Sequence, residues 1–227
     1  MKVLIFLGSQ RDSTPPRPAR LGARIARACE RQLQQSGFET DIIDPLDFEL
    51  SGVFRPHFAY AKGRSPADLD SLAQKIEAAD GFVMVSPEYN HSMSPSLANL
   101  LNHFGSSLFS FKPSAIVTYS AGQWGGARAA VNMRTFLGEL GCLPVSAMVH
   151  VPHAQNVFNE NGQFASDVDA KRWEGYFGRT FDQLMWWSEA AMEQHRRSPI
   201  TAIFDKSPSQ RDAPQLSLTV IGSDLSH

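Results

Sequence analysis

The chain has 227 residues, 42% of them hydrophobic and 19% charged, and a net charge of −2 at pH 7. This length favours one domain, which we place at residues 1–197, with a C-terminal tail at residues 198–227. The near balance of 21 basic and 23 acidic residues gives no reason to expect a nucleic acid partner. No apolar stretch is as long as a membrane span, and the N-terminal run is too short for a signal peptide. We therefore expect a cytoplasmic protein without a membrane partner.

The two cysteines, Cys29 and Cys142, lie far apart in the sequence. Cys29 falls inside a helical pattern, and Cys142 comes just before an apolar run. This usage is typical of small buried thiols in a reducing compartment and not of a disulfide framework.

Short apolar or β-branched runs alternate with longer amphipathic stretches, which indicates strand–helix units on a parallel sheet. The expected strands are residues 2–7, 39–43, 81–86, 114–120 and 143–151. The expected helices are residues 21–36, 67–79, 95–104, 127–140 and 167–194. The strands show little polar alternation, as expected where helices cover both faces of a sheet. The pattern therefore predicts an α/β fold with five parallel strands.

The first expected helix has one apolar face and several arginines elsewhere. The apolar residues at helical spacing are Leu21, Ile25, Ala28, Cys29 and Leu33. The residues that project elsewhere are Arg24, Arg27, Arg31 and Gln32. We interpret the arginines as a solvated flank, because arginine is mostly exposed in proteins.

Two segments fall outside the alternating pattern. Residues 50–66 form a long insertion with aromatic residues, among them Phe54, Phe58 and Tyr60. Because loops of this length are usually functional or interfacial, we expect the insertion to cover a ligand crevice or contact a second subunit. From Ser198 onward the composition predicts a poorly ordered tail, in which residues 216–221 could add a strand.

A polar segment follows the first expected strand. It begins Gly8-Ser9-Gln10-Arg11 and leads through a proline-rich stretch to Arg20-Leu21-Gly22 at the head of a helix. Hydroxyl groups, free backbone amides and a helix N-terminus suit a phosphate, and an arginine adds a bidentate donor. A plain strand-to-helix turn is the alternative.

Other phosphate-handling classes do not match this segment. A P-loop needs Gly-Lys-Ser or Gly-Lys-Thr at its end, and a dinucleotide fingerprint needs three spaced glycines. A cysteine phosphatase needs a thiolate in this loop, yet no cysteine precedes Cys29. The segment is therefore expected to hold a phosphate and not to cleave it.

Two more polar segments follow the third and fourth expected strands. In Pro87-Glu88-Tyr89-Asn90, an aromatic ring and an amide are available to a planar heterocycle. Residues 119–128 offer glycines, Ser120 and Gln123 to a carbonyl-rich ring edge, with a simple glycine-rich helix entry as the alternative. Loops at the carboxyl ends of parallel strands line one crevice, so the three segments are expected to converge on one ligand.

Glu88 and His91 invite an acid–base interpretation. A carboxylate in such a loop more often caps or pairs with neighbouring groups than acts in catalysis. We therefore expect Glu88 to be structural, capping or pairing within its loop, and His91 to be a surface or hydrogen-bonded histidine.

With these motifs the chain resembles the NADPH-dependent FMN reductase family, flavodoxin-like oxidoreductases that include quinone and azo-compound reductases. The resemblance runs from about residue 2 to residue 196. It rests on Gly8-Ser9-x-Arg11, Pro87-Glu88-Tyr89-Asn90 and Tyr119-Ser120-x-Gly122-x-x-Gly125-Gly126. It implies a flavodoxin-like three-layer sandwich with strand order 2-1-3-4-5 and FMN at the switch point.

The resemblance also implies the cofactor-binding residues. They are Ser9, Arg11, Ser13, Arg20, Leu21 and Gly22 for the phosphate, Pro87, Glu88, Tyr89 and Asn90 for the ribityl chain and ring, and Tyr119, Ser120, Ala121, Gly122 and Gln123 for the pyrimidine edge. Residues 12–19 are longer and richer in proline than the usual first loop of the family. Ser13, Thr14, Arg17 and Arg20 are therefore alternatives for reaching the phosphate.

The implied activity is a ping-pong oxidoreduction with FMN and NADPH or NADH. Hydride passes through flavin N5 to a small electron acceptor such as a quinone, a free flavin or an azo dye, and the cofactor carries the chemistry. The aromatic residues that could wall the acceptor space are Trp124, Phe54, Phe58 and Tyr60. Arg128 could meet a 2′-phosphate, and the choice between NADH and NADPH stays open.

Family members commonly form homodimers or homotetramers, and Trp186 and Trp187 could belong to such a face. Two other functions stay open: a flavin-binding electron carrier without NAD(P)H turnover, and a domain that has kept the fold but lost the flavin. The balanced charge disfavours the carrier, because carriers of this type usually present a strongly acidic face to their partners.

Overall fold

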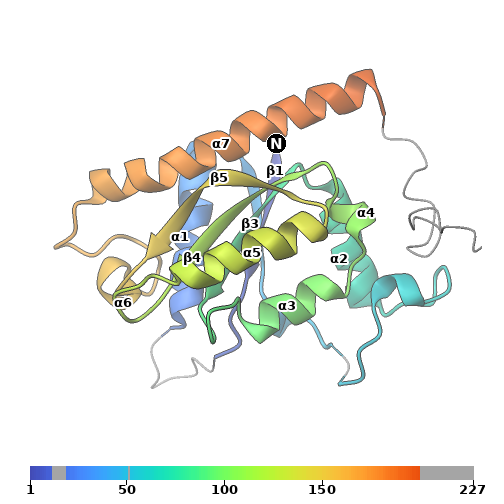
Figure 1. Cartoon of the computed structure of the whole chain (residues 1–227), viewed down its shortest axis with the longest axis horizontal. Coiled ribbons are helices and arrows are strands. Elements are labelled where there is room, and N and C mark those ends of the chain that lie inside the picture. Colours follow the sequence, from blue (N-terminus) through green and yellow to red (C-terminus); the bar gives the residue numbers. More distant parts are fainter. Residues whose placement is uncertain (12–18, 51, 200–227) are drawn as a thin grey trace, which may run out of the picture.

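The structure, a computed structural model, describes residues 1–11, 19–50 and 52–199. Within these ranges five parallel strands form one sheet in the order β2-β1-β3-β4-β5 (Figure 1). The strands are β1 (Lys2–Leu7), β2 (Glu39–Ile43), β3 (Gly81–Pro87), β4 (Pro113–Tyr119) and β5 (Leu143–Val151). The sheet order and all five strands are confirmed, with boundaries that move by one residue in β3 and β4. The expected strand at residues 216–221 lies outside the described residues.

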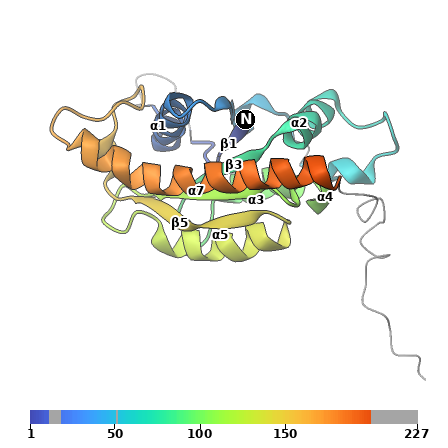
Figure 2. The ribbon, with the colours of Figure 1, turned by 90° about the horizontal axis from the view of Figure 1, so that it is seen from above.

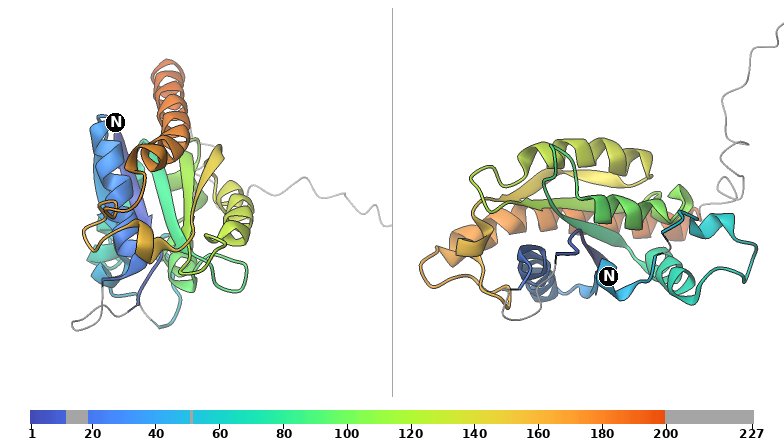
Figure 3. Two further views of the ribbon diagram at one scale, coloured as in Figure 1. Left: turned by 90° about the vertical axis from the view of Figure 1, so that its left-hand side faces the viewer. Right: turned by 90° about the horizontal axis from the view of Figure 1, so that it is seen from below.

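The helices connect the strands and cover both faces of the sheet. They are α1 (Leu21–Gln35), α2 (Ala67–Ala78), α3 (Pro95–Asn102), α4 (Ser106–Phe109), α5 (Ala127–Glu139), α6 (Ala154–Val157) and α7 (Ala170–Arg197), with short 3₁₀ turns η1 (Pro45–Asp47) and η2 (His57–Ala59). Figure 3 shows α1 and α5 on opposite sides of the strands, and Figure 2 shows α7 running across the molecule between them in projection. The fold therefore has three layers: helices, the sheet, and helices on its other face.

Two apolar cores explain why the strands read as nearly continuous hydrophobic runs. Val3, Ile5 and Leu7 of β1 pack toward α1 and α7, together with valines of β3, β4 and β5. Leu4 and Phe6, which point to the other face, pack with α2, α3 and α5. Successive residues of a strand face opposite sides, so both sets must be apolar when both faces are covered.

Two helix boundaries differ from the expected ones for local reasons. Helix α7 begins at Ala170 because the Asp169 carboxylate accepts a hydrogen bond from the Arg172 amide at 3.1 Å, and it continues to Arg197. The expected helix at residues 95–104 ends at Asn102, and Gly105 then takes an extended conformation before α4. None of the described helices is long and apolar enough to cross a membrane.

The insertion packs on the far part of α3 and on the start of α2. The His57 amide donates to the His103 carbonyl at 2.7 Å, and the rings of Phe54 and His103 lie 4.9 Å apart. The His57 imidazole also meets the Asp70 carboxylate at 2.8 Å, and a hydrogen bond from Ser65 helps to lower the pKa of that carboxyl. These contacts hold the described part of the insertion, residues 50 and 52–66, against α3 and α2.

Both cysteines are buried and free, as expected. Burial raises the pKa of the Cys142 thiol to about 12 and raises that of Cys29 further. Neither thiol is therefore a nucleophile near neutral pH.

Candidate active site at the carboxyl ends of the strands

A cavity of about 850 Å³ opens at the carboxyl ends of β1, β3 and β4. Its lining comprises Ser9, Arg11, Ala19, Arg20, Leu21, Arg24, Pro87, Glu88, Tyr89, Tyr119, Ser120, Ala121 and Gln155. These residues come from the loops after the three strands, from the head of α1 and from α6. Loops far apart in the sequence therefore meet in one crevice, hereafter the crevice, as the parallel topology requires.

Close packing of α1 against the sheet sets the narrow end of the crevice. A Cβ atom added to Gly22 would lie 2.5 Å from the Tyr119 hydroxyl and 2.8 Å from Leu7 Cδ1. Tyr119 is 5% exposed, and burial raises the pKa of its phenol, although a hydrogen bond with Ser9 opposes the shift. Glycine at position 22 thus lets the helix N-terminus approach Ser9 and Tyr119.

Arg20 is already held by the protein. Its guanidinium makes two hydrogen bonds to the Asp44 carboxylate and one to the Ser9 carbonyl, and its side chain is 8% exposed. These bonds connect the loop after β1 to the segment after β2. Arg11, in contrast, is exposed and lines the crevice. Arg11 is therefore the better placed of the two to reach a phosphate, while Arg20 shapes the loop.

Arg24 was expected in a solvated flank, and that prediction is wrong. The residue is 9% exposed; its Nε donates to the Ala19 carbonyl at 3.2 Å, and its Nη1 donates to the Phe158 carbonyl at 3.1 Å. Glu160 adds an ion pair at 3.7 Å. The guanidinium thus sits where the first loop, α1 and the segment after α6 meet, which a one-dimensional pattern does not reveal.

The segment after α6 is a tight turn, residues 158–164, which we call the strap. Phe158 and Phe164 pair as an antiparallel bridge, and their rings lie 5.1 Å apart. Gly162 has φ of +71°, and a Cβ atom there would lie 2.4 Å from the Arg24 carbonyl. Arg27 and Arg31 donate to the carbonyls of Glu160 and Asn161. The arginines of α1 therefore bind the strap instead of facing solvent alone.

The loop after β3 is a tight two-residue turn. The amides of Tyr89 and Ser92 each donate to the other's carbonyl at 2.9 Å, and the two residues between them are left-handed, with φ of 50° at Asn90 and 63° at His91. Asparagine tolerates this conformation better than most residues do. The turn leaves Tyr89 44% exposed at the crevice and turns Asn90 out of the lining.

Glu88 pairs with helix α5 and not within its own loop. Its Oε1 accepts from Arg128 Nε at 3.0 Å, and its Oε2 lies 3.5 Å from the Ala129 amide in the first turn of α5. A carboxylate at a helix N-terminus is favoured by the helix dipole. The expected structural pairing thus exists, and it engages the arginine that could otherwise meet a 2′-phosphate.

The loop after β4 holds itself together through Ser120. The Ser120 hydroxyl donates to the Gly122 carbonyl at 2.7 Å and accepts from the Gly125 amide at 2.9 Å. Gln155 Nε2 donates to the Ala121 carbonyl at 3.1 Å. Ser120 therefore organises the loop, whose backbone also bonds Val151 and Ala154.

Most of the expected cofactor residues lie in the lining of the crevice. Those in the lining are Ser9, Arg11, Arg20, Leu21, Pro87, Glu88, Tyr89, Tyr119, Ser120 and Ala121; those outside it are Gly22, Asn90, Gly122 and Gln123. Ser13 lies outside the described residues, as do Thr14 and Arg17. The expected acceptor walls, Trp124, Phe54, Phe58 and Tyr60, are not in the lining. The described part of the insertion does not line the crevice either.

Sequence reasoning missed Ala19, Arg24 and Gln155 of the lining. Ala19 and Arg24 flank the predicted phosphate segment, so a wider window around it would have included them. Gln155 lies in α6, a four-residue helix too short to give a periodic signal.

Known proteins resemble this chain in sequence and in fold. An NAD(P)H-dependent FMN reductase of Pseudomonas aeruginosa is 37% identical over 112 residues, which cover 48% of this chain and 60% of that protein. A 2-hydroxy-1,4-benzoquinone reductase of a Burkholderia species is 32% identical over 178 residues, covering 75% of this chain and 89% of that protein. A solved flavoenzyme, an NAD(P)H:acceptor oxidoreductase from Paracoccus denitrificans, matches with a TM-score of 0.62 at 20% identity, over 81% of this chain and 97% of that one.

The family comparison covers the part of the chain that builds the crevice. The profile of the NADPH-dependent FMN reductases matches residues 1–156. This range contains all five strands and the three loops that meet at their carboxyl ends. The flavodoxin-like fold expected from the sequence is thus confirmed, and the chain belongs to the NADPH-dependent FMN reductase family.

Proposed function

We propose that this chain is an FMN-dependent NAD(P)H oxidoreductase that reduces small electron acceptors. The observation that supports this most directly is the crevice itself, which gathers three loops and a helix N-terminus around about 850 Å³. That volume is within the range of about 300–1,000 Å³ typical of ligand pockets. The relatives named above act as FMN, quinone or acceptor reductases, and this chain's crevice would serve the same class of reaction.

The phosphate end of FMN fits the head of α1. Arg20, the residue before α1, makes no side-chain cap, so the amides of the first turn keep their capacity to bind an anion. Three arginines line the crevice, and two of them already have ion-pair partners, Arg20 with Asp44 and Arg24 with Glu160. A dianionic phosphate would therefore bind Arg11, Ser9 and the amides at the head of α1.

The ring end of FMN fits the loops after β3 and β4. Tyr89, which is 44% exposed, presents aromatic surface, and Tyr119, Ser120 and Ala121 line the same crevice. When bound there, FMN would supply the hydride chemistry between NAD(P)H and the acceptor. The chain's own residues would bind the cofactor, orient it and exclude water, and none of them need act as a nucleophile.

Quinones, free flavins and azo dyes are the acceptors that we propose, with NADPH or NADH as donor. We also propose a homodimer or homotetramer in the cytoplasm. Trp186 and Trp187 of α7 support an oligomer because they are 60% and 41% exposed and stack edge to face at 4.7 Å. Exposed tryptophans of this kind are enriched at protein interfaces. Light scattering at micromolar concentration would report a mass above that of one chain.

An anaerobic titration tests the proposed function. The protein purified with FMN should show flavin absorbance bands that bleach when NADPH is added and return when a quinone is added. Bound flavin that NADPH does not bleach would instead identify an electron carrier. Absence of any flavin bands would contradict the cofactor assignment.

Substitution of Arg11 tests the phosphate end separately. Loss of a charge-assisted hydrogen bond in Arg11→Ala should weaken FMN binding by about 1.5–3 kcal/mol. Arg172→Ala, an exposed arginine of α7 outside the crevice lining, is the matched control and should leave the affinity unchanged. Equal FMN dissociation constants for the Arg11→Ala variant and the wild type would remove Arg11 from the site.

A further inference from the structure

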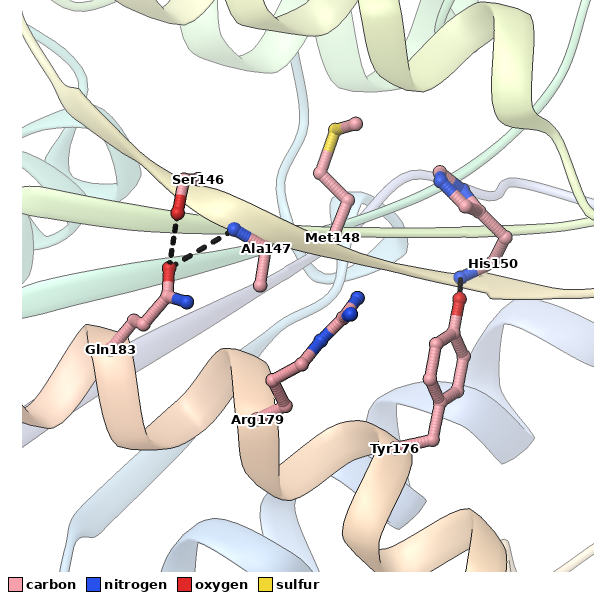
Figure 4. A pocket seen from close by; sticks show the side chains of 7 residues that line it. All are labelled: Ser146, Ala147, Met148, His150, Tyr176, Arg179 and Gln183. Atoms are coloured by element: carbon pink, nitrogen blue, oxygen red, sulfur yellow. Dashed lines mark hydrogen bonds between the residues drawn. The ribbon is translucent and has the colours of Figure 1, made fainter.

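A second cavity, of about 330 Å³, lies at the free edge of β5, where α7 crosses it (Figure 4). It is lined by Ser146, Ala147, Met148, His150, Tyr176, Arg179 and Gln183. It shares no residue with the lining of the crevice. We call it the edge pocket.

Three residues of α7 form one wall of the edge pocket. Tyr176, Arg179 and Gln183 are spaced three and four residues apart, which places them on one face of the helix. Figure 4 shows Arg179 between the other two along the edge of β5. Because β5 ends the described sheet, one side of this strand has no neighbouring strand.

Side chains of α7 replace the missing neighbour. Gln183 Oε1 accepts from the Ala147 amide at 3.0 Å and from Ser146 Oγ at 2.8 Å, and the Tyr176 hydroxyl oxygen accepts from the His150 amide at 3.0 Å. An edge whose amides are bonded in this way is a poor template for another strand. The edge pocket is therefore unsuited to an extended peptide.

These bonds also determine which polar atoms remain available. A backbone amide can only donate, so the atom of Gln183 that faces Ala147 must be the oxygen, and the amide nitrogen is left as a donor. The Tyr176 oxygen accepts from an amide in the same way, which leaves its hydroxyl proton to donate. Among the described residues, neither of these donors has an acceptor.

The charge of the edge pocket is positive. Arg179 forms no ion pair with any described residue, and no Asp or Glu belongs to the lining. Its guanidinium lies 5.8 Å from the centre of the Tyr176 ring. Arg134 of α5 donates to the carbonyls of Val145 and Ser146 and places a second positive charge near the same edge. A cation and neutral donors without an acid form a receptor for negative charge.

We propose that the edge pocket binds a small oxyanion, a carboxylate or a phosphate-type group, between Arg179, Gln183 and Tyr176. Such a group offers only acceptors and matches the planar fork of a guanidinium. About 330 Å³ is at the small end of ligand pockets, which favours a compact anion over a nucleotide. The proposal does not depend on the function proposed for the crevice.

The edge pocket touches the back of a crevice loop through His150. His150 Nδ1 lies 2.8 Å from Thr118 Oγ1, and a Cβ atom added to Gly125 would lie 3.1 Å from His150 Cβ. Gly125 belongs to the loop after β4 that Ser120 organises. An anion in the edge pocket would therefore lie one side chain away from that loop.

Titration calorimetry with sulfate on the full chain loaded with FMN tests the proposal. Sulfate keeps its charge over the pH range of the assay, and FMN occupies the phosphate end of the crevice. We expect saturable binding in the wild type, at least tenfold weaker binding in Arg179→Gln, and wild-type affinity in Arg172→Gln, an exposed arginine of the same helix outside the lining. Arg179→Lys, which keeps the charge but loses the fork, should give an intermediate affinity.

Two results would overturn the proposal: no saturable binding to the wild type, or equal affinities in the wild type and Arg179→Gln. If the chain does not retain FMN, the same titration on Arg11→Ala separates the two sites. Arg11→Ala alters the crevice and leaves the edge pocket as it is. If Arg11→Ala still binds sulfate saturably, and adding Arg179→Gln weakens that binding at least tenfold, the edge pocket is supported even though the proposed function has failed. Circular dichroism of each variant confirms that the fold is retained.

Discussion

The crevice and the edge pocket use polar side chains in opposite ways. In the crevice Arg20, Arg24, Glu88 and Ser120 are all bonded to other groups of the protein. In the edge pocket Arg179 has no ion-pair partner among the described residues, and Gln183 keeps a free donor. Loops lack a regular hydrogen-bonding pattern and need side chains to satisfy them, whereas α7 and β5 satisfy most of their own backbone. Substitution of a buried, bonded crevice residue such as Arg24 should therefore change stability and binding together, and substitution of Arg179 in the edge pocket should change binding alone.

The largest effect is expected for Arg24→Met. The change removes a buried guanidinium and leaves the carbonyls of Ala19 and Phe158 without its hydrogen bonds, so we expect a loss of about 3 kcal/mol in the free energy of unfolding. FMN affinity should fall as well, because the first loop and the strap lose their common anchor. Urea denaturation and a flavin titration measure the two effects.

The control for this variant is Arg27→Met on the same helix. Arg27 is exposed, and its side chain donates a hydrogen bond of 2.8 Å to the Glu160 carbonyl, so its loss should cost less than about 1 kcal/mol. Equal costs for the two variants would show that burial does not distinguish these arginines. If Arg24→Met is destabilised but keeps full flavin affinity, stability and binding are separate in the crevice. That result would contradict the contrast between the crevice and the edge pocket.

Gly22→Ala tests the close approach of α1 to the sheet. The added methyl group would meet the Tyr119 hydroxyl and Leu7 Cδ1 at 2.5 and 2.8 Å, so we expect a cost of about 2 kcal/mol and weaker FMN binding. Gly175→Ala is the matched control, since it is also helical but has no atom within 4 Å of the added Cβ. It should stabilise the protein by up to about 1 kcal/mol. Thermal unfolding of both variants distinguishes crowding from helix propensity.

The five strands were predictable because each is a short apolar run between amphipathic helices, whereas the strand order was implied by the family resemblance. Val3 to Leu7 illustrate this: both faces are apolar, so the run predicts a strand covered on both sides. The three crevice loops were predictable for the same reason, since the topology alone brings the carboxyl ends of β1, β3 and β4 together.

The partners of individual side chains were not predictable from the sequence. Arg24 and Arg27 both lie on α1 and both donate to carbonyls of the strap, more than 130 residues away. Arg24, which also donates to the Ala19 carbonyl, is buried, and Arg27 is exposed. The insertion has the aromatic composition of a lid, yet its contacts with His103 and Asp70 fix it beside α3 and α2. In both cases a contact distant in sequence decides the outcome, and no local pattern encodes it.

A smaller effect is expected for Glu88→Gln. Its partner Arg128 is 50% exposed, and such ion pairs contribute about 0–1 kcal/mol, so stability should change little. NADPH-driven bleaching of the flavin should also keep most of its rate, because the carboxylate binds Arg128 and the start of α5. General acid–base catalysis contributes about 10²–10⁴-fold, so a rate loss of that size in a folded variant would give Glu88 a chemical role. Arg128→Gln removes the same ion pair from the other side and should cost more, because it leaves the Glu88 carboxylate, whose side chain is 12% exposed, without its charged partner.

The smallest effect is a pH dependence at the edge pocket. Burial, and then the charge of Arg179, lower the pKa of His150 below its ordinary value of about 6.5. Thr118 of β4 contacts the imidazole at Nδ1, Arg179 of α7 supplies the charge that acts on it, and Tyr176 of α7 bonds the His150 backbone amide. As pH falls below about 6.5 the unfolded chain takes up a proton before the folded one does, so the free energy of unfolding decreases until the folded pKa is reached.

Urea denaturation of the wild type and His150→Gln over this pH range measures that term as the difference between the two curves. Sulfate should reduce the difference, because an anion beside Arg179 offsets the positive charge that disfavours imidazolium and so raises the pKa of His150 in the folded state. Arg179→Gln should reduce the difference without sulfate and abolish the sulfate effect. If sulfate changes the pH dependence equally in the wild type and Arg179→Gln, the anion acts elsewhere. Arg179 would then not be available to a ligand, and the contrast with the bonded arginines of the crevice would fail.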